Sequence, residues 1–260
     1  MSHVYMPTGM STVAHKAELA KHMNRLRKFF PEEFDFYPRT WLLPEEQEEF
    51  EAYAYRKREQ GKAMTYILKP DEGAQGEGIF LFQNPRDLCA LKVPSVVQEY
   101  ISKPLLIRGL KFDLRLYVLV VGLDPPEVYL STSGMVRFCT IPYQPPSVKN
   151  LHQTFMHLTN YSLNKRSKDY VHSEEEEGGG QEGSKRTLTS VWAELIAQGC
   201  DMDEMWGKVG KLVGKTVVAV LPQLMVEQKT FILENSLKQP PKGFQVCSTP
   251  SSALGGHRYL

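Results

Sequence analysis

The sequence lacks several features of secreted mini-domains, membrane proteins and nucleic-acid-binding proteins. It has only four cysteines, with no CxxC pair and no spacing typical of metal ligands. With no secretory leader evident, we expect free thiols in a reducing compartment. The longest apolar stretch is expected near residues 117–123 and is far shorter than the roughly 20 residues that cross a bilayer. The net charge of +1 gives no support for nucleic-acid binding through a strongly basic surface.

The composition is typical of a folded globular protein. Hydrophobic residues make up 42% of the 260 residues and charged ones 23%, a balance that argues against global disorder. The charge is uneven along the chain, because nine acids and four bases fall in residues 31–61 and the counts reverse in residues 101–173. The first segment can be interpreted as a solvated helix face. The second would attract an acidic partner.

Several segments have a helical pattern. An apolar stripe at spacings of four, three and four predicts an amphipathic helix over residues 12–30. A second helix is expected from about Pro44, followed by acidic residues that suit its N-terminal dipole. Residues 187–197 and 202–221 also look helical, and Pro222 should end or kink the last helix.

Short β-type runs begin at Thr65, and together they predict a mostly antiparallel sheet. They are residues 65–69, 79–82, 96–101, 111–122, 127–132 and 135–141. Ser133 and Gly134 suit a tight hairpin turn between the last two runs. The low-complexity residues 173–184 predict a mobile loop, and the tail of residues 229–260 is expected to be irregular.

A glycine-rich segment lies between the first two expected strands. Glycines 73, 76 and 78 would let the backbone approach phosphate oxygens closely, and Lys69 supplies a positive charge. The segment is neither a Walker A loop nor a dinucleotide fingerprint that opens a helix. A plain turn would explain the glycines as well, so these residues alone leave both interpretations open.

Two further segments gather polar side chains. Alternation along the expected strand of residues 111–122 sends Lys111, Asp113 and Arg115 to one face, where they could bind a ligand or pair with one another. Residues 156–165 are dense in hydrogen-bonding side chains and suit the wall of a pocket. A capped turn or a satisfied core histidine at His157 would explain that segment almost as well.

Taken together, these segments resemble the tubulin tyrosine ligase-like proteins. The shared motifs occur in the order and approximate spacing of that family, and they are PRTW (38–41), KPDxGxQGxGI (69–79), QxYIxxP (98–104), KFDLR (111–115), GxxRF (134–138), MHLTNYSxNK (156–165) and GSKR (183–186). The resemblance covers about residues 10–226. Within the family, the motif sequences are most similar to those of the tubulin polyglutamylases.

The resemblance implies an α+β fold of the ATP-grasp type, incomplete here, with mostly antiparallel sheets and flanking helices. Residues 1–61 would be a helical N-terminal part, residues 62–228 the incomplete core, and residues 229–260 a divergent irregular tail. The implied reaction uses ATP to phosphorylate a glutamate side chain of a tubulin tail, and the amine of free glutamate then attacks the acyl phosphate. The implied partners are acidic tails of tubulin or microtubules and free L-glutamate, with no nucleic acid and no membrane.

Family position also implies the site residues. Those expected to bind ATP are Lys69, Gln75, Gly76, Gln98, Glu99, Tyr100, Ile101, Lys111, Asp113, Thr159 and Asn160. Within this set, residues 98–101 would form the adenine hinge. Those expected to hold free glutamate are Arg137, Tyr161, Ser162 and Lys185, and Arg and Lys are suitable partners for carboxylates. No residue is assigned a catalytic role.

The chain departs from the family pattern in three places. After about Gln228 the resemblance stops, and no Leu-Glu-Val-Asn element appears, so the magnesium expected for the family has no visible ligands. The beginning is short, and Glu77 replaces a basic residue of the phosphate loop. We expect a truncated isoform, a fragment or a decayed relative.

Two functional classes follow from the resemblance and the departures. The chain would be a tubulin glutamate ligase, or an inactive relative that binds tubulin or another partner. Either would act in the cytoplasm on the microtubule cytoskeleton, with the cilium or basal body as a further expected location.

Overall fold

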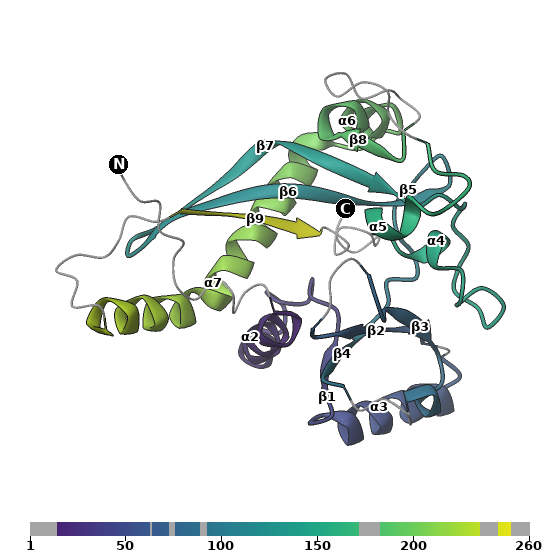
Figure 1. The fold of residues 1–260 in the computed structure, drawn as a ribbon, viewed down its shortest axis with the longest axis horizontal. Coiled ribbons are helices and arrows are strands. Elements are labelled where there is room, and N and C mark those ends of the chain that lie inside the picture. Colours follow the sequence, from purple (N-terminus) through teal and green to yellow (C-terminus); the bar gives the residue numbers. More distant parts are fainter. Residues whose placement is uncertain are drawn as a thin grey trace.

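The computed structural model describes residues 15–62, 64–72, 76–88, 93–171 and 183–234, and the backbone of 244–250. Within these residues, helices and antiparallel strands form two α+β parts, drawn one below the other in Figure 1. The N-terminal part contains a four-stranded sheet and the C-terminal part a five-stranded sheet. The expected α+β class with mostly antiparallel sheets is confirmed.

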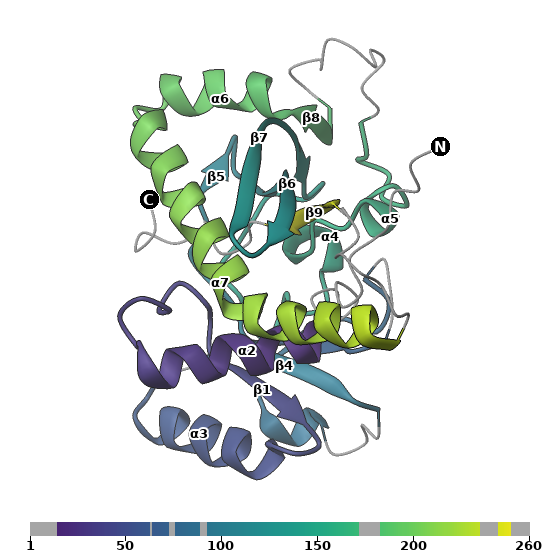
Figure 2. The same ribbon diagram turned by 90° about the vertical axis from the view of Figure 1, so that its left-hand side faces the viewer.

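The four-stranded sheet has the strand order β1-β4-β2-β3, and every neighbouring pair is antiparallel. Its strands are β1 (Thr40–Leu43), β2 (Tyr66–Pro70), β3 (Phe80–Phe82) and β4 (Ser95–Glu99), with a 3₁₀ turn at Pro85–Leu88. Helix α3 (Gln47–Glu59) packs its Phe50 and Tyr53 against Trp41 on one face. Helix α2 (Lys16–Phe29) covers the opposite face, where Ala20 meets Leu42 (Figure 2).

The five-stranded sheet has the order β5-β6-β7-β8, and β9 pairs with β6 as well. Its strands are β5 (Leu106–Ile107), β6 (Leu110–Leu123), β7 (Pro126–Phe138), β8 (Lys185–Thr187) and β9 (Phe244–Pro250). Alternate residues of β6 are buried in one large hydrophobic cluster that also contains residues of α6 (Leu188–Ala197) and α7 (Met202–Glu234). Because strand side chains alternate, the other β6 face is left for the polar residues of KFDLR.

The prediction of a hairpin turn at Ser133 and Gly134 is wrong. Strand β7 runs unbroken from Pro126 to Phe138, and the turn that joins it to β6 lies at residues 124–125. A Cβ atom on Gly134 would lie 2.7 Å from the carbonyl oxygen of Arg115. The glycine is therefore needed for close approach of two strands beside a register shift, and not for a turn.

Helix α7 continues through Pro222 to Glu234, so the proline does not end it. The helix bends along its length (Figures 1 and 2), as expected when a proline removes one helical hydrogen bond. By length and hydropathy alone, α7 could also cross a membrane, and it is a longer apolar segment than the one expected at residues 117–123. Its buried residues instead belong to the hydrophobic core, packed against β6 and α2.

The tail is more regular than expected. Residues 229–234 belong to α7, and residues 244–250 form β9, which pairs antiparallel with β6. The loop expected at residues 173–184 lies outside the described residues, apart from Gly183 and Ser184.

The glycine at the β6–β7 contact gives a stability prediction. Gly134→Ala should lower the free energy of unfolding by roughly 1–3 kcal/mol, because the added methyl group pushes against the Arg115 backbone. Gly210→Ala in α7 is the matched control, since no atom lies within 4 Å of its Cβ position. The control should be neutral or stabilising by up to about 1 kcal/mol. Urea unfolding of both variants checks this, and equal stability of Gly134→Ala and the wild type would contradict it.

Candidate functional site

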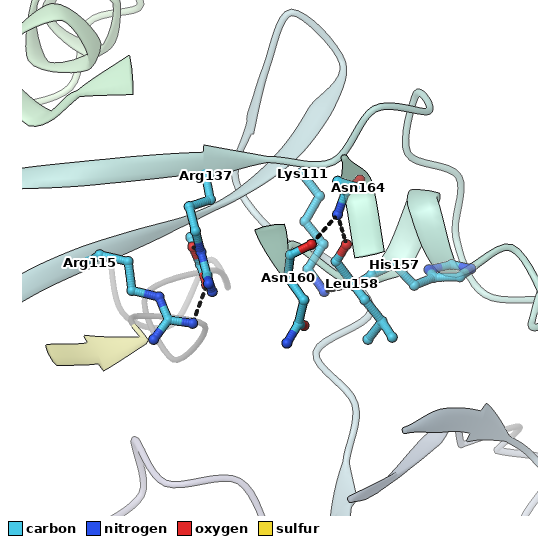
Figure 3. Close-up of polar contacts among 8 residues, drawn as sticks. Lys111, Arg115, Arg137, His157, Leu158, Asn160 and Asn164 are labelled. Carbon is cyan, nitrogen blue, oxygen red and sulfur yellow. Dashed lines mark hydrogen bonds and ion pairs between the residues drawn. The ribbon is translucent and has the colours of Figure 1, made fainter. Parts of the chain in front are cut away.

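The polar motifs meet where the two sheets approach each other. A cluster of Ile67, Leu81, Tyr100 and Leu158 joins the first sheet to the segment that holds the short helices α4 (Thr154–His157) and α5 (Tyr161–Asn164). This contact brings residues of β2 and β4 close to residues of β6 and β7. Figure 3 shows the C-terminal side of the site, with Lys111, Arg115 and Arg137 projecting from the strands.

Lys69 is on β2 and its side chain is partly buried. Its Nζ donates to Oε1 of Gln98 on the adjacent strand, at 2.8 Å. Nε2 of Gln98 in turn donates to the Thr40 hydroxyl, at 2.8 Å. Burial lowers the pKa of Lys69 to about 8, and the charges of Lys111 and Lys16 lower it further. The amide of Gln98 orients Lys69 but does not neutralise it.

Lys111, at the start of β6, is partly buried in the same way. Its Nζ donates to the Tyr100 hydroxyl and to the His157 carbonyl oxygen, both at 2.8 Å. Burial lowers the pKa of Lys111 to about 8. Among the described residues, neither Lys111 nor Lys69 has a carboxylate oxygen within 4 Å. Two partly buried ammonium groups with no carboxylate oxygen in direct contact, among the described residues, are suited to a polyanionic ligand.

Asp113 is 4% exposed and is held by two guanidinium groups. It faces Arg137 across the β6–β7 pair, and Arg137 binds both of its carboxylate oxygens, with Nε at 2.9 Å from Oδ1. Arg115 lies 3.4 Å from Oδ2 (Figure 3). Burial raises the pKa of Asp113, and Arg137 opposes the rise. The ion-pair interpretation of this face is therefore correct for Asp113.

An open pocket of about 290 Å³ lies on the same sheet face. Its lining residues are Arg115, Tyr117, Met135, Arg137, Tyr161 and Lys185. Three of the four residues expected to hold an amino acid meet here, whereas Ser162 is next to the pocket in sequence but not among its lining residues. Nε of Arg115 is buried and has no hydrogen-bond partner among the described residues. Arg115, which lines the pocket, therefore keeps one donor without a protein partner among the described residues.

The glycine-rich segment packs against the α5 region. Gly76 has φ +91°, and a Cβ there would lie 2.7 Å from Cδ1 of Leu163 and 3.1 Å from the Asn160 amide. A glycine is therefore required where the segment passes Asn160. Gln75 lies outside the described residues. Glu77 is exposed, so its carboxylate is not buried beside the lysines.

Asn164 fixes the segment that carries Thr159 and Asn160. Its Nδ2 donates to the carbonyl oxygens of Leu158 (2.7 Å) and Asn160 (3.0 Å), as Figure 3 shows. Its Oδ1 accepts from the Thr140 amide at 3.2 Å. Thr159, which is buried, donates a side-chain hydrogen bond that stabilises the ionised form of Asp113. The motif residues are thus held by side chain–backbone bonds rather than by a long helix.

The residues expected at the adenine hinge lie at the end of β4. The backbone N–H groups of Glu99 and Tyr100 donate to the carbonyls of Arg39 and Thr65. The Glu99 carboxylate turns toward α3, where it accepts from the Tyr53 hydroxyl at 2.6 Å. A ligand at this end would therefore meet main-chain groups beyond Tyr100.

Sequence reasoning missed Lys16 as a site residue. Lys16, at the start of α2, donates to the Asp71 carbonyl oxygen at 3.1 Å, and its charge lowers the pKa of Lys69. The adjacent Ala17 amide donates to the Asp71 carboxylate at 2.9 Å, which anchors α2 to the start of the glycine-rich segment. No local pattern could reveal a contact across 55 residues.

Metal-ligating side chains do not gather in a cluster within the described residues. These residues contain no group of three or more His, Cys, Asp or Glu side chains that could hold a metal ion. The buried carboxylate at the site, Asp113, is already engaged by two arginines.

Comparison with known proteins matches residues 2–236 to the Tubulin-tyrosine ligase family. The chain is similar to Tubulin polyglutamylase TTLL11 of Homo sapiens, at 45% identity over 224 residues, which are 84% of this chain and 31% of that protein. It is also similar to Tubulin polyglutamylase TTLL13 of Homo sapiens (41% over 211 residues; 81% and 24%) and to Tubulin polyglutamylase ttll-11 of Caenorhabditis elegans (37% over 240 residues; 92% and 33%). The chain spans a third or less of the length of these relatives.

The partly buried Lys69 predicts a pH-dependent effect on stability. The pKa of Lys69 is lowered in the folded state, so the unfolded chain binds more protons between about pH 8 and 10.5 and this lysine destabilises the fold below pH 8. Lys69→Met should therefore raise the free energy of unfolding at pH 7 by roughly 1–2 kcal/mol, with a smaller gain near pH 10. Urea unfolding across this pH range measures it. Lys103→Met, at an exposed position, is the control, and destabilisation by Lys69→Met at pH 7 would refute the prediction.

Proposed function

Because the chain belongs to the tubulin-tyrosine ligase family, we propose that it forms the nucleotide- and amino-acid-binding core of an ATP-dependent ligase. This ligase would add glutamate to glutamate side chains of tubulin tails. The α+β arrangement of two sheets is the ATP-grasp-like fold expected of the family. The relatives named tubulin polyglutamylases are about three or more times longer than the matched region, so the activity of the whole is part of the proposal.

The observation that carries the proposal is a pair of partly buried lysines that contact no carboxylate within the described part of the chain. Lys69 and Lys111 come from different sheets, and each is oriented by neutral acceptors. A polyphosphate placed between them would supply the missing negative charge, with Lys16 contributing from α2. ATP would bring the phosphoryl group that activates a carboxylate for attack by an amine.

The remaining expected ATP residues have distinct parts in the proposal. Gly76, packed on Asn160, would bring the glycine-rich backbone to the phosphates, together with Gln75. Residues 98–101 would line the adenine end, where β4 leaves the sheet. Asp113 and Thr159, already bonded to one another, would face the ribose and phosphate side of the nucleotide.

The neighbouring pocket is suited to an acidic amino acid. Arg115, Arg137 and Lys185 bring three positive charges to it, and Asp113 offsets one. The excess matches the two carboxylates of free glutamate. Tyr161 lines the same pocket, and Ser162 adjoins it in sequence. Arg137 bonds Asp113 and also lines the pocket, so it would join the amino-acid site to the nucleotide site.

We extend the proposal to organisation and location. Residues 1–61 would belong to the N-terminal part of the ligase region, residues 62–228 to the core, and residues 229–260 to a divergent tail. A magnesium ion bound together with ATP would take ligands from the phosphates and from water, because the described residues gather no cluster of three metal-ligating side chains. The protein would act on the microtubule cytoskeleton, in the cytoplasm or at a cilium or basal body.

Two variants separate the two parts of the site. ATP should raise the unfolding temperature of the wild type, because a ligand that binds only the folded state stabilises it. Lys69→Met should remove most of that shift. Lys185→Ala should keep the shift but weaken glutamate binding about tenfold or more, since it removes a charged donor. Lys103→Ala should change neither.

Thermal unfolding with ATP and calorimetric titration with glutamate measure these effects. No ATP shift in a cooperatively unfolding wild type would overturn the nucleotide site. If that protein still bound microtubules, and lost binding when their acidic tails were removed, it would be a binding relative and not a ligase.

A further inference from the structure

His157 is a buried histidine next to the proposed phosphate lysine. It is 1% exposed and lies between the rings of Tyr100 and Tyr143, which it meets edge-on at 5.7 and 5.8 Å. Its Nδ1 is 3.2 Å from the Tyr100 hydroxyl, and its Nε2 is 3.1 Å from the Asn150 carbonyl oxygen. Both ring nitrogens therefore have a partner. The Tyr100 hydroxyl can donate a hydrogen bond, whereas the Asn150 carbonyl oxygen can only accept one.

The hydrogen-bond inventory determines where the proton on the ring lies. A carbonyl oxygen only accepts, so Nε2 must carry the proton that points to Asn150. A neutral imidazole then has a bare Nδ1, and Tyr100 is the group positioned to donate to it. Burial and the charge of Lys111 lower the pKa of His157 to about 4, which keeps the ring neutral at physiological pH.

This arrangement orients the Tyr100 hydroxyl. Once its proton is directed to His157, its oxygen is free to accept from Nζ of Lys111, as observed at 2.8 Å. The same ammonium also donates to the His157 carbonyl oxygen. An ammonium has three N–H donors, so one remains for a ligand. Figure 3 shows the Lys111 side chain between its strand and the segment that carries His157.

We propose that His157 is a positioning residue for Lys111, acting through Tyr100 as the Nε2–H tautomer. It would set the direction of the one Lys111 donor left for an anion. The proposal rests on the proposed function in so far as that anion is the phosphate of ATP. Its hydrogen-bond chain runs from Asn150 through His157 and Tyr100 to Lys111 and does not depend on the ligand.

The far end of this chain is fixed independently. The Asn150 side chain accepts from the Ser147 amide at 2.8 Å and donates to the Pro145 carbonyl at 3.0 Å, so its own carbonyl is held in place. Tyr143 is the competing partner for Tyr100, since their hydroxyls are also within bonding reach. The Tyr143 hydroxyl donates to the Ser102 carbonyl at 2.8 Å, so toward Tyr100 it can only accept, and it competes with Nδ1 of His157 for the Tyr100 proton. Other titratable groups near Lys111 are Lys69, the Asp113 carboxylate, whose charge raises the pKa of Lys111, and the buried thiol of Cys139, whose pKa burial raises to about 12.

A double-mutant cycle on ATP binding tests the coupling. Calorimetry on the full chain would compare the wild type, Tyr100→Phe, His157→Phe and the double variant. Each single change should weaken ATP binding about tenfold, and the double variant should be no weaker than the weaker single one, because both break the same chain. Unchanged affinity in His157→Phe, or effects that multiply to about a hundredfold, would overturn the proposal. His152→Phe, at an exposed position in the same segment, should bind ATP like the wild type.

A second measurement starts from the wild type and needs no nucleotide. ¹⁵N NMR of the histidine rings should show His157 as the neutral Nε2–H tautomer from pH 7 down to about pH 5. In Tyr100→Phe the Nδ1 resonance should move toward that of an unbonded nitrogen, which a merely space-filling histidine would not show. An Nδ1–H tautomer, or an imidazolium at pH 7, would refute the chain. If the wild type bound no ATP while the tautomer was as expected, the nucleotide site would be wrong and the hydrogen-bond chain would stand.

Discussion

The site depends on keeping positive charge in a place where burial opposes it. Lys69 and Lys111 have a lowered pKa because they are buried and, in the case of Lys69, because the other lysine is near. Replacing either lysine by an apolar residue would remove the free-energy cost of burying its charge. Stability therefore does not explain why these lysines are present. Every neighbour that contacts them is a neutral acceptor, namely an amide, a hydroxyl or a carbonyl. These neighbours orient the charges and leave them available to an incoming anion.

The adjoining arginines, unlike the two lysines, are paired with a carboxylate. Arg137 and Arg115 meet a carboxylate, Asp113, which fixes Arg137 through two hydrogen bonds and leaves Arg115 with an unused donor. One face of β6 therefore carries three charged residues in order. Lys111 contacts neutral acceptors, Asp113 is a carboxylate, and Arg115 shares that carboxylate with Arg137. The positive charges along this strand are thus neutralised to different extents. Such a strand can hold a phosphate at one end and a carboxylate ligand at the other.

Local sequence predicted the parts of this molecule that depend on neighbours in the chain. Apolar periodicity gave α2 and α7, and alternation identified β6 and the shared face of Asp113 and Arg115. It failed where a distant contact determines the role of a residue. Gly134 looks like a turn residue until the Arg115 backbone is known to lie against it, and Pro222 lies in a helix that tertiary packing continues past it. The partners of Lys111 lie 11 and 46 residues away, so no motif could identify them, although the family resemblance did bring the lysine itself to attention.

The pairing of β6 with β9 has a consequence for how the chain reaches its fold. The register places Arg115 opposite Pro250, so two strands that lie side by side are separated by most of the C-terminal half of the sequence. On a ribosome, β6 and β7 can pair as soon as they emerge, but the other edge of β6 stays open until residue 250 has been made. Strand edges that wait for a distant partner fold slowly and are exposed to other chains in the meantime. Synthesis of this protein should therefore be most sensitive to chaperone supply in the interval between the β6–β7 hairpin and β9.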